Sequence, residues 1–307
     1  IEEMFEEFTL IAPPMEEVME EEFEEMTFEP MLTLIEEIPM EEEFFEETTS
    51  VVMEELKEEF ELEEPPKMSM KEELNEETTL TEEMPKSMLE IKERPILNHI
   101  VDVYNSHGIK EITVVRGFQK EAIDLPSLRY VDNDEYADTS ELVSFQKALV
   151  GINLNQDLFV SFGDVLFKPY LLQLMDGFEN DVVIAVDTQW QDSVNKERAA
   201  DYVHCSEPHT RDSYSHEIFL KISAENLDPK IIDGEWMGVV KFSKNIIPIL
   251  NESMNKMRKE TDFDAAKLHH LFTHLVSEGI KVKVVYTTGH WLDIDTLEDL
   301  LSAGNFL

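Results

Sequence analysis

Apolar and polar positions follow two different periods after residue 85, and the two periods succeed one another along the chain. Arg94–Gly108 has apolar residues at helical spacing, a proline near its start and a glycine at its end, which predicts a helix. Glu111–Phe118 is rich in β-branched residues and predicts a strand. The same criteria predict further helices over 139–151, 168–177, 244–260, 264–279 and 296–304, and further strands over 127–133, 156–167, 181–187, 201–207, 217–223, 235–243 and 281–287.

The order of these elements predicts the fold class. Helices and strands alternate at first, the strands between about residues 188 and 243 follow one another without helices, and helices then return. This order is typical of an α/β, three-layer, Rossmann-like fold with a mostly parallel central sheet and an antiparallel insertion. Ligands of such sheets bind beyond the carboxyl ends of the strands, so candidate residues are weighed by whether they lie there.

Residues 1–84 differ from the rest of the chain in composition and charge. They hold 32 Glu and three Lys, a net charge of −29, and no glycine, whereas the other 223 residues hold 36 acidic and 22 basic residues. We therefore predict a Glu-rich N-terminal segment over 1–66 and a folded domain over 67–307. This composition fits an acidic appendage. It also fits a sequence that departs from the natural one in this segment, and peptide mass mapping of the purified protein would distinguish the two alternatives.

The charge and the cysteine content of the chain restrict its expected partners and its expected cellular compartment. An acidic surface repels phosphate backbones, so we expect no binding to DNA or RNA. Cys205 is the one cysteine, which is typical of a reducing compartment, and we expect it to be a small buried hydrophobe. No apolar run approaches about 18 residues, so no membrane span is predicted. The N-terminal residues lack a signal-peptide pattern, and we expect a cytoplasmic protein.

Acidic residues lie at the ends of two predicted strands. Asp164 follows a buried apolar run, where a carboxylate can hold a divalent cation over the ligand crevice. An ordinary Gly163-Asp164 turn is the structural alternative. Asp293 and Asp295 lie between the last strand and the last helix, and strand alternation points both to one side. Asp295 or Thr296 could instead cap the final helix.

Two basic side chains could meet phosphate groups. Lys86 follows Pro85, which fixes the backbone, and a lysine held there could neutralise the phosphates of a nucleotide. A solvated loop lysine is the alternative. Arg211 lies in a polar, histidine-rich loop that could contact an anionic substrate. His270 and His274 share a helix face but lack a third ligand at a recognisable spacing, so we expect no zinc site there.

Taken together, these positions resemble a family of nucleotidyltransferases that join a nucleoside triphosphate to a small phosphorylated or phosphonylated acceptor. Within that family the chain is most similar to the cytidylyltransferases that act on phosphocholine or on phosphonates of the 2-aminoethylphosphonate type. Some phosphonate members are fused to phosphoenolpyruvate mutase, of which no motif is present. The resemblance extends over about residues 80–305 and rests on "LTEEMPKSMLEIKERPIL", "ITVVRGF", "VDNDEYADTSELVSFQKAL", "LFVSFGDVLF", "GEWMGVVKFS" and "WLDIDTLEDL".

The resemblance implies a transfer of CMP from CTP to the acceptor with release of pyrophosphate. It implies that Lys86 contacts the triphosphate and stabilises the transition state, and that Asp164 and Asp295 hold Mg²⁺. It makes residues 67–307 the nucleotidyltransferase domain. The expected partners are CTP and a small phosphonate or phosphate-ester acceptor, and the oligomeric state, including a homo-oligomer, is left open.

The resemblance also implies where the two substrates lie. The nucleotide side would be lined by Thr139, Ser140 and Ser144. The acceptor would be faced by Glu235 and Trp236, because a carboxylate and an aromatic ring suit a cationic amine or choline group. Arg211 is the further acceptor-binding candidate.

The chain departs from the family at the phosphate-binding loop. The family has Gly-x-Gly-x-Arg before the Leu-Thr of this stretch, and those positions fall on Glu72, Leu74 and Glu76. Glycine allows the backbone to approach a triphosphate closely, and carboxylates repel it. We therefore expect weak or absent turnover. A sugar-1-phosphate nucleotidyltransferase and a catalytically inactive binding or scaffold protein are the alternatives.

Overall fold

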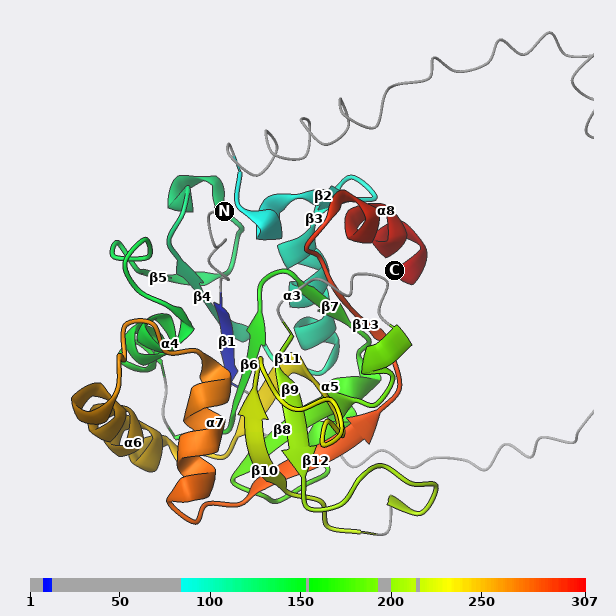
Figure 1. The fold of residues 1–307 in the computed structure, drawn as a ribbon. Helices are drawn as coiled ribbons and strands as arrows, with labels where there is room; N and C mark the ends of the chain where they lie inside the picture. The colour runs from blue at the N-terminus through cyan, green and yellow to red at the C-terminus, as the bar shows by residue number, and fades with distance from the viewer. Residues whose placement is uncertain (1–7, 13–83, 153–154, 193–199, 214–215) are drawn as a thin grey trace, which may run out of the picture. The chain divides into compact units, whose positions relative to one another are not determined.

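The structure is a computed structural model (Figure 1), and it describes residues 8–12, 84–152, 155–192, 200–213 and 216–307. Contacts group Ile1–Met15 with Glu76–Leu307 into one compact unit, and a second unit is Glu16–Asn75. The second unit lies outside the described residues. The predicted domain boundary at residue 66 also lies outside them and stays a prediction.

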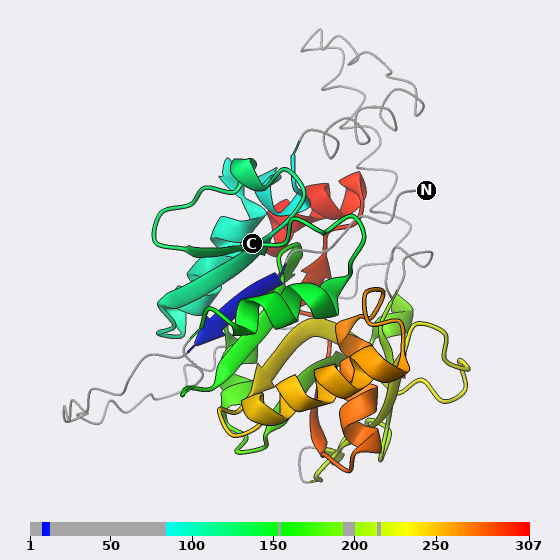
Figure 2. The same ribbon diagram turned by 90° about the vertical axis from the view of Figure 1, so that its left-hand side faces the viewer.

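Within the described residues, a nine-stranded mixed sheet forms the centre of the first unit (Figures 1 and 2). The strands follow the order β10-β9-β11-β6-β1-β4-β5, and β8 pairs with both β11 and β12. Their bounds are β1 Phe8–Ala12, β4 Glu111–Arg116, β5 Arg129–Asp132, β6 Leu158–Phe162, β8 Val182–Asp187, β9 Tyr202–Cys205, β10 Leu220–Ala224, β11 Gly234–Phe242 and β12 Val282–Thr287.

Strand direction shows how the predicted parallel sheet is built. The neighbours β4 and β5 are parallel, and so are β8 and β12. The remaining neighbours are antiparallel, because β1 and β11 are inserted between strands of the opposite direction. β1 is antiparallel to β4 and β6, and β11 is antiparallel to β6 and β8. It follows that β4, β5, β6, β8 and β12 all run in one direction. The predicted α/β Rossmann-like class is confirmed, and so is the antiparallel excursion, which consists of β9, β10 and β11.

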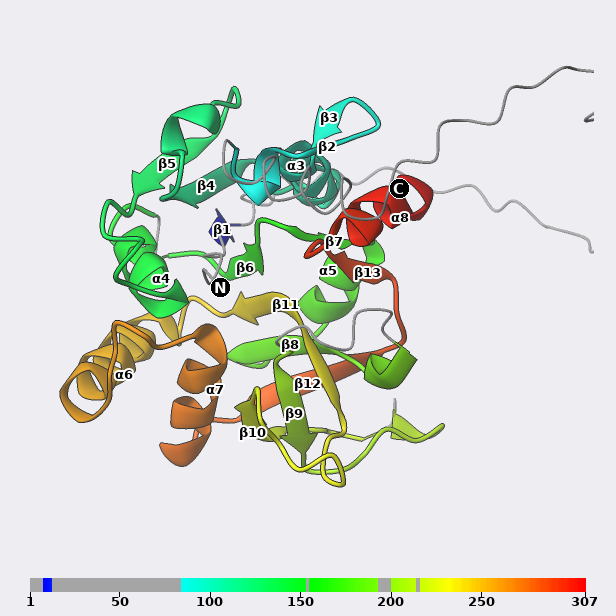
Figure 3. The ribbon, with the colours of Figure 1, turned by 45° about the horizontal axis from the view of Figure 1, so that its top comes forward.

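Helices cover both faces of this sheet (Figure 3). One face carries α3 (Ile96–Ser106) and α5 (Tyr170–Asp176). The other carries α4 (Glu141–Leu149), α6 (Ile247–Glu260) and α7 (Leu268–Ser277). The last helix, α8 (Leu297–Phe306), contacts a two-stranded ribbon of β2 (Glu90–Ile91) and β3 (Arg94–Pro95). Short 3₁₀ turns are η1 (Lys86–Met88), η2 (Lys120–Ala122) and η3 (Trp190–Asp192). The predicted three-layer arrangement is therefore present.

The core lies between the central strands and the helices. Every residue of β6, β8 and β11 is buried, which agrees with the mainly apolar sequences of these strands. Phe159 and Phe242 are completely buried, and each such side chain contributes roughly 2–3 kcal/mol of hydrophobic stabilisation. Cys205 is buried as expected, and burial raises the pKa of its thiol to about 12.

A β-bulge bends β11 beside the candidate site. The register of β11 against β8 shifts between Trp236 and Val240. Gly238 takes a φ of +68° there, and a Cβ atom on it would lie 2.6 Å from the ring of Phe162. Trp236 Nε1 donates across the bulge to the Val239 carbonyl at 2.9 Å. The bulge thus fixes the indole of Trp236 in the interior.

Among the features that the pattern does not predict, two bear on the sheet and the site. The ribbon of β13 (Trp291–Asp293) and β7 (Val165–Phe167) is short, and Trp291–Asp293 lies in the predicted connection between the last strand and the last helix. The strand Phe8–Ala12 lies within the predicted Glu-rich segment, and its backbone pairs with β4 and β6. Among the described helices, none is both long and apolar enough to cross a membrane.

Candidate active site

Three residues from distant parts of the sequence meet at one end of the sheet. Lys86 begins η1, Asp164 lies between β6 and β7, and Asp295 lies between β13 and α8. Lys86 Nζ donates a hydrogen bond to Asp295 Oδ1 at 2.8 Å and lies 3.7 Å from Asp164 Oδ2. Figures 1 and 3 show that the segment after residue 84 lies near the C-terminal helix α8. The structure therefore brings together the predicted catalytic lysine and both predicted metal ligands.

The electrostatics of this group depend on burial and on the short charge distances. Burial alone would lower the pKa of Lys86, but the carboxylates of Asp164, Asp295 and Asp293 outweigh it and raise that pKa. Burial raises the pKa of Asp164, against the opposing effect of Lys86. Only 5% of the Asp164 side chain is exposed, compared with 17% for Lys86 and 29% for Asp295. Lys86 is thus a charged ammonium that is held between two carboxylates.

The backbone around Asp295 shows which residue caps α8. The N-cap of α8 is Thr296, whose hydroxyl accepts from the Asp299 N–H, while Asp299 Oδ2 accepts from the Thr296 N–H at 2.9 Å. Ile294 is buried, and its N–H donates to the Asp164 carbonyl at 3.2 Å. Because the helix is capped without it, the Asp295 side chain is available to Lys86, and the charge of Asp293 also raises the pKa of Lys86.

The carboxylates here fit a magnesium ion. Asp164 Oδ1 is buried and accepts no hydrogen bond from any described residue. A buried carboxylate oxygen without a partner is costly, and a cation would compensate it. The donors are oxygens, which Mg²⁺ prefers, and it needs only one or two protein carboxylates when phosphates supply further ligands. Asp164 and Asp295 could therefore hold the ion. Lys86 compensates the negative charge of both carboxylates.

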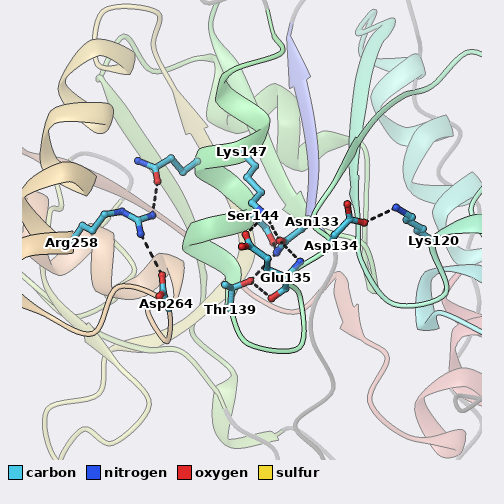
Figure 4. Close-up of polar contacts among 10 residues, drawn as sticks. Lys120, Asn133, Asp134, Glu135, Thr139, Ser144, Lys147, Arg258 and Asp264 are labelled. Carbon is cyan, nitrogen blue, oxygen red and sulfur yellow. Dashed lines mark hydrogen bonds and ion pairs between the residues drawn. The ribbon is translucent and has the colours of Figure 1, made fainter.

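The predicted nucleotide side is organised around a residue that the pattern analysis missed. Asn133, which is buried, donates from Nδ2 to Thr139 Oγ1 and to Ser144 Oγ, both at 3.0 Å (Figure 4). Lys147 Nζ donates to Asn133 Oδ1 at 2.6 Å. Ser140 is the N-cap of α4, and its N–H donates to the Asp264 carbonyl at 2.7 Å. These contacts fix the loop before α4, and the contact of Thr139, Ser140 and Ser144 with a nucleotide stays a prediction.

A pocket lies next to the lysine–carboxylate group. Val165, which follows Asp164, and Asp293, which precedes Asp295 by two residues, both line it. Its free space, counted together with the part that is open to solvent, is about 410 Å³. The other lining residues are mainly carboxylates, aromatic rings and one lysine, namely Glu141, Asp201, Glu225, Glu235, Phe162, Trp236, Trp291 and Lys267, with Ala200 and Gly238. Negative charge over aromatic walls favours a cationic group.

The predicted acceptor residues fall into two places. Glu235 and Trp236 both line this pocket, although each is only 2% exposed. The Trp236 ring packs edge-on against Phe162 and Phe272, with centroids 5.2 and 4.9 Å apart. Arg211 lies on an exposed loop and is not among the lining residues, so its role as an acceptor contact stays a prediction.

The pattern analysis missed Asp201 and Glu225, two further acidic residues of the pocket. Asp201 precedes β9 and Glu225 follows β10, and these strands are antiparallel with Tyr202 opposite Ala224. The register therefore places Asp201 and Glu225 side by side. Pairing the two predicted strands in this register would have found them. Trp291 was missed because its position depends on Asp187, whose Oδ2 accepts from Trp291 Nε1 at 2.8 Å.

The chain is similar to known proteins in sequence and in fold. Residues 80–255 match the family model described as a MobA-like NTP transferase domain. The CTP:phosphoglutamine cytidylyltransferase of Campylobacter jejuni is 23% identical over 234 residues, which are 72% of this chain and 91% of that protein.

Two solved structures share the fold. The inositol-1-phosphate CTP transferase from T. maritima has a TM-score of 0.59 and 18% identity over 76% of this chain and 89% of that one. The CTP:phosphocholine cytidylyltransferase from Streptococcus pneumoniae has a TM-score of 0.53 and 16% identity over 74% and 91%. At these identities the likeness concerns the fold alone.

Proposed function

Because this chain belongs to the MobA-like NTP transferase domain family, and is therefore a nucleotidyltransferase, we propose that it is a Mg²⁺-dependent cytidylyltransferase for a small phosphonate or phosphocholine-type acceptor. The observation that carries this proposal is the convergence of Lys86, Asp164 and Asp295 beside a pocket rich in carboxylates. The first group suits a metal-bound triphosphate, and the pocket suits an acceptor that carries a positive charge.

The proposed reaction is a single in-line displacement. An oxygen of the acceptor phosphonate or phosphate forms a bond to the α-phosphorus of CTP, and the bond from that phosphorus to the β-phosphate bridging oxygen breaks. Pyrophosphate leaves with the electron pair of the broken bond. The acceptor oxygen is already anionic, so no general base is required. Positioning and charge neutralisation then supply most of the catalysis.

Lys86 has the main catalytic role among the described residues. Its ammonium group donates hydrogen bonds and neutralises the charge that develops on the phosphates during the displacement. Asp164 and Asp295 would hold Mg²⁺, which when bound supplies further charge neutralisation. When CTP is bound, the ammonium of Lys86 would exchange a carboxylate partner for a phosphate oxygen.

The acceptor side follows from the pocket chemistry. An ammonium or trimethylammonium group would lie among Glu235, Asp201 and Glu225, with the rings of Trp236 and Trp291 beside it. Asp293 lies at the boundary between the pocket and Lys86. An acceptor bound there would direct its phosphonate toward Lys86 and away from the repelling carboxylates.

The expected rate is low. The family's glycine-rich loop corresponds to Glu72, Leu74 and Glu76, which lie outside the described residues. Without glycine the backbone amides cannot approach the triphosphate closely, and the carboxylates oppose its charge. We expect turnover below about 1 s⁻¹, which is the lower end of typical enzyme rates.

A pyrophosphate-release assay with a panel of substrates tests the proposal. CTP with 2-aminoethylphosphonate or phosphocholine should give slow, Mg²⁺-dependent release that no other nucleotide matches. Preference for a sugar 1-phosphate would replace the proposal with the sugar-nucleotide alternative. No release with any pair, together with no calorimetric binding of millimolar CTP and Mg²⁺, would favour the non-catalytic scaffold.

A further inference from the structure

A chain of polar contacts connects the start of α7 to a carboxylate in the acceptor pocket. The Lys267 backbone N–H donates to His270 Nδ1 at 2.9 Å. His270 Nε2 lies 3.2 Å from His269 Nε2, and the two rings are 4.0 Å apart. His269 Nδ1 lies 2.6 Å from Asp201 Oδ1. His269 is 1% exposed, whereas Asp201 lines the pocket.

The backbone donor at one end fixes the proton positions along this chain. Because His270 Nδ1 accepts from an N–H, neutral His270 carries its proton on Nε2. His270 Nε2 then donates to His269 Nε2, and neutral His269 must carry its proton on Nδ1. That nitrogen lies 2.6 Å from Asp201 Oδ1, although the contact lacks the geometry of a directed hydrogen bond. Two hydrogen bonds thus lead from Lys267 through His270 to His269, and a close polar contact connects His269 to Asp201.

Asp201 is held from two sides. Its carbonyl accepts from the Trp236 N–H at 2.9 Å, which ties its backbone to β11. Its side chain meets His269, which belongs to α7. The helix is in turn tied to the sheet, because Thr273 Oγ1 accepts from the Ser223 N–H at 3.0 Å. Asp201 therefore has little freedom to turn away from the pocket.

We propose that His269 is a positioning residue for the acceptor: the close contact of its Nδ1 with Asp201 Oδ1 holds Asp201 as the carboxylate that receives the acceptor's ammonium group. This inference rests on the proposed function, because it assumes that the pocket binds a cationic acceptor. It makes His269 a determinant of the preference for ammonium-bearing acceptors over neutral sugar phosphates. His270 supports it by setting the tautomer of His269.

The same groups also suggest a metal site, but the proton chain opposes it. The ligand atoms of Asp201, Glu225 and His269 all lie within 4.8 Å of one another. A metal on His269 Nδ1 would have to displace the proton that the backbone of Lys267 fixes there through His270. Lys267 Nζ already lies 2.8 Å from Glu225 Oε1 and compensates its charge. A carboxylate that is held by its close contact with the His269 ring agrees better with these distances.

Acceptor binding by calorimetry on the full chain tests this role without requiring turnover. The ligands are 2-aminoethylphosphonate and ethylphosphonate, which lacks only the amine. His269→Leu removes the donor, and His269→Asn keeps an N–H near the Nδ1 position. His274→Leu, on the same helix but not among the pocket-lining residues, is the matched control. Loss of the polar contact that holds this carboxylate predicts about tenfold weaker binding of 2-aminoethylphosphonate to His269→Leu.

The pattern across ligands and variants decides the outcome. We expect His269→Asn and His274→Leu to bind 2-aminoethylphosphonate within about threefold of the original chain, and all variants to bind ethylphosphonate equally. Equal losses in the Leu and Asn variants, equal losses for both ligands, or no binding to the original chain would overturn the proposal. Nitrogen-15 NMR supplies a second measurement: a neutral His269 protonated on Nε2 would overturn it in any case. Failure of the proposed function shows separately, as absence of pyrophosphate release.

Discussion

Lys86 carries a positive charge into a region of concentrated negative charge, and its two short contacts explain how that arrangement is stable. The ammonium lies 2.8 Å from Asp295 and 3.7 Å from the buried Asp164. Removing one partner of a buried ion pair leaves the other uncompensated, at a cost of about 3–5 kcal/mol in fully buried cases. Lys86 is partly exposed, so its contribution is smaller. The same residue thus neutralises the charge of the two carboxylates and serves the proposed chemistry.

Lys86→Met separates these two roles. The variant should lose at least about 100-fold in kcat, because one preorganised charge at the reacting phosphates is removed. Its melting temperature should also fall, and millimolar Mg²⁺ should restore it more than it raises that of the original chain, because the carboxylates have lost their ammonium partner. Thermal melts and initial rates measure both effects. Lys259→Met, on the exposed side of α6, is the control, and equal behaviour of the two variants would contradict this role.

At the level of elements, the site depends on strand ends and on a bulge. The carboxyl end of β8 provides Asp187, whose Oδ1 accepts from the N–H groups of Gln189 and Gly289, both at 2.9 Å. Its Oδ2 accepts from Trp291 Nε1 at 2.8 Å. One carboxylate thereby fixes the loop that leads to β13, and with it one aromatic wall of the pocket.

Asp187→Asn should disturb the acceptor pocket more than the nucleotide side. The amide keeps one acceptor oxygen but places an NH₂ group against either the backbone donors or the indole. We expect KM for the acceptor to rise by about tenfold, with KM for CTP within about twofold. Steady-state kinetics with each substrate varied in turn provides the measurement. Asp262→Asn, at an exposed position, controls for the loss of one charge, and a larger change for CTP than for the acceptor would count against the account.

Gly238→Ala tests the bulge. The added methyl would lie 2.6 Å from the Phe162 ring at a residue with φ of +68°, whereas Gly279 has φ of +87° and open space around it. Both substitutions cost backbone strain, about 1 kcal/mol, and only Gly238→Ala adds a clash. We expect its melting temperature to fall further than that of Gly279→Ala by at least about 2–4 °C. Equal shifts in the two variants would show that the bulge accommodates a side chain.

At the level of the whole molecule, charge opposes the proposed substrates. The chain has a formal net charge of −43, and both CTP and the acceptor's phosphonate are anionic. Long-range repulsion of this kind is screened as ionic strength rises, because the Debye length falls to about 10 Å at 0.1 M salt. We therefore expect kcat/KM for CTP to increase severalfold between about 10 and 150 mM NaCl. A monotonic decrease would mean that local attraction at Lys86 dominates the approach of the nucleotide.

Much of this arrangement could be predicted from the sequence, and the remainder depends on tertiary contacts. Periodicity predicted the main helices and strands, and the family resemblance predicted the meeting of Lys86, Asp164 and Asp295, which periodicity alone could not give. The partners of His269 and Trp291 come from other elements, so no local pattern marks them. Phe8–Ala12 pairs with strands distant in sequence, within a stretch whose composition predicts no particular partner.

The most direct test of the central claim is the formation of a CMP-acceptor product from α-labelled CTP in a single-turnover reaction. Excess enzyme is mixed with labelled CTP, 2-aminoethylphosphonate and Mg²⁺, and the products are separated. The account predicts slow product formation that disappears with EDTA and falls by at least about 100-fold in Asp164→Asn and in Lys86→Met. Product formation that survives EDTA, or that proceeds equally in both variants, would show that this lysine–carboxylate group is not the catalytic centre.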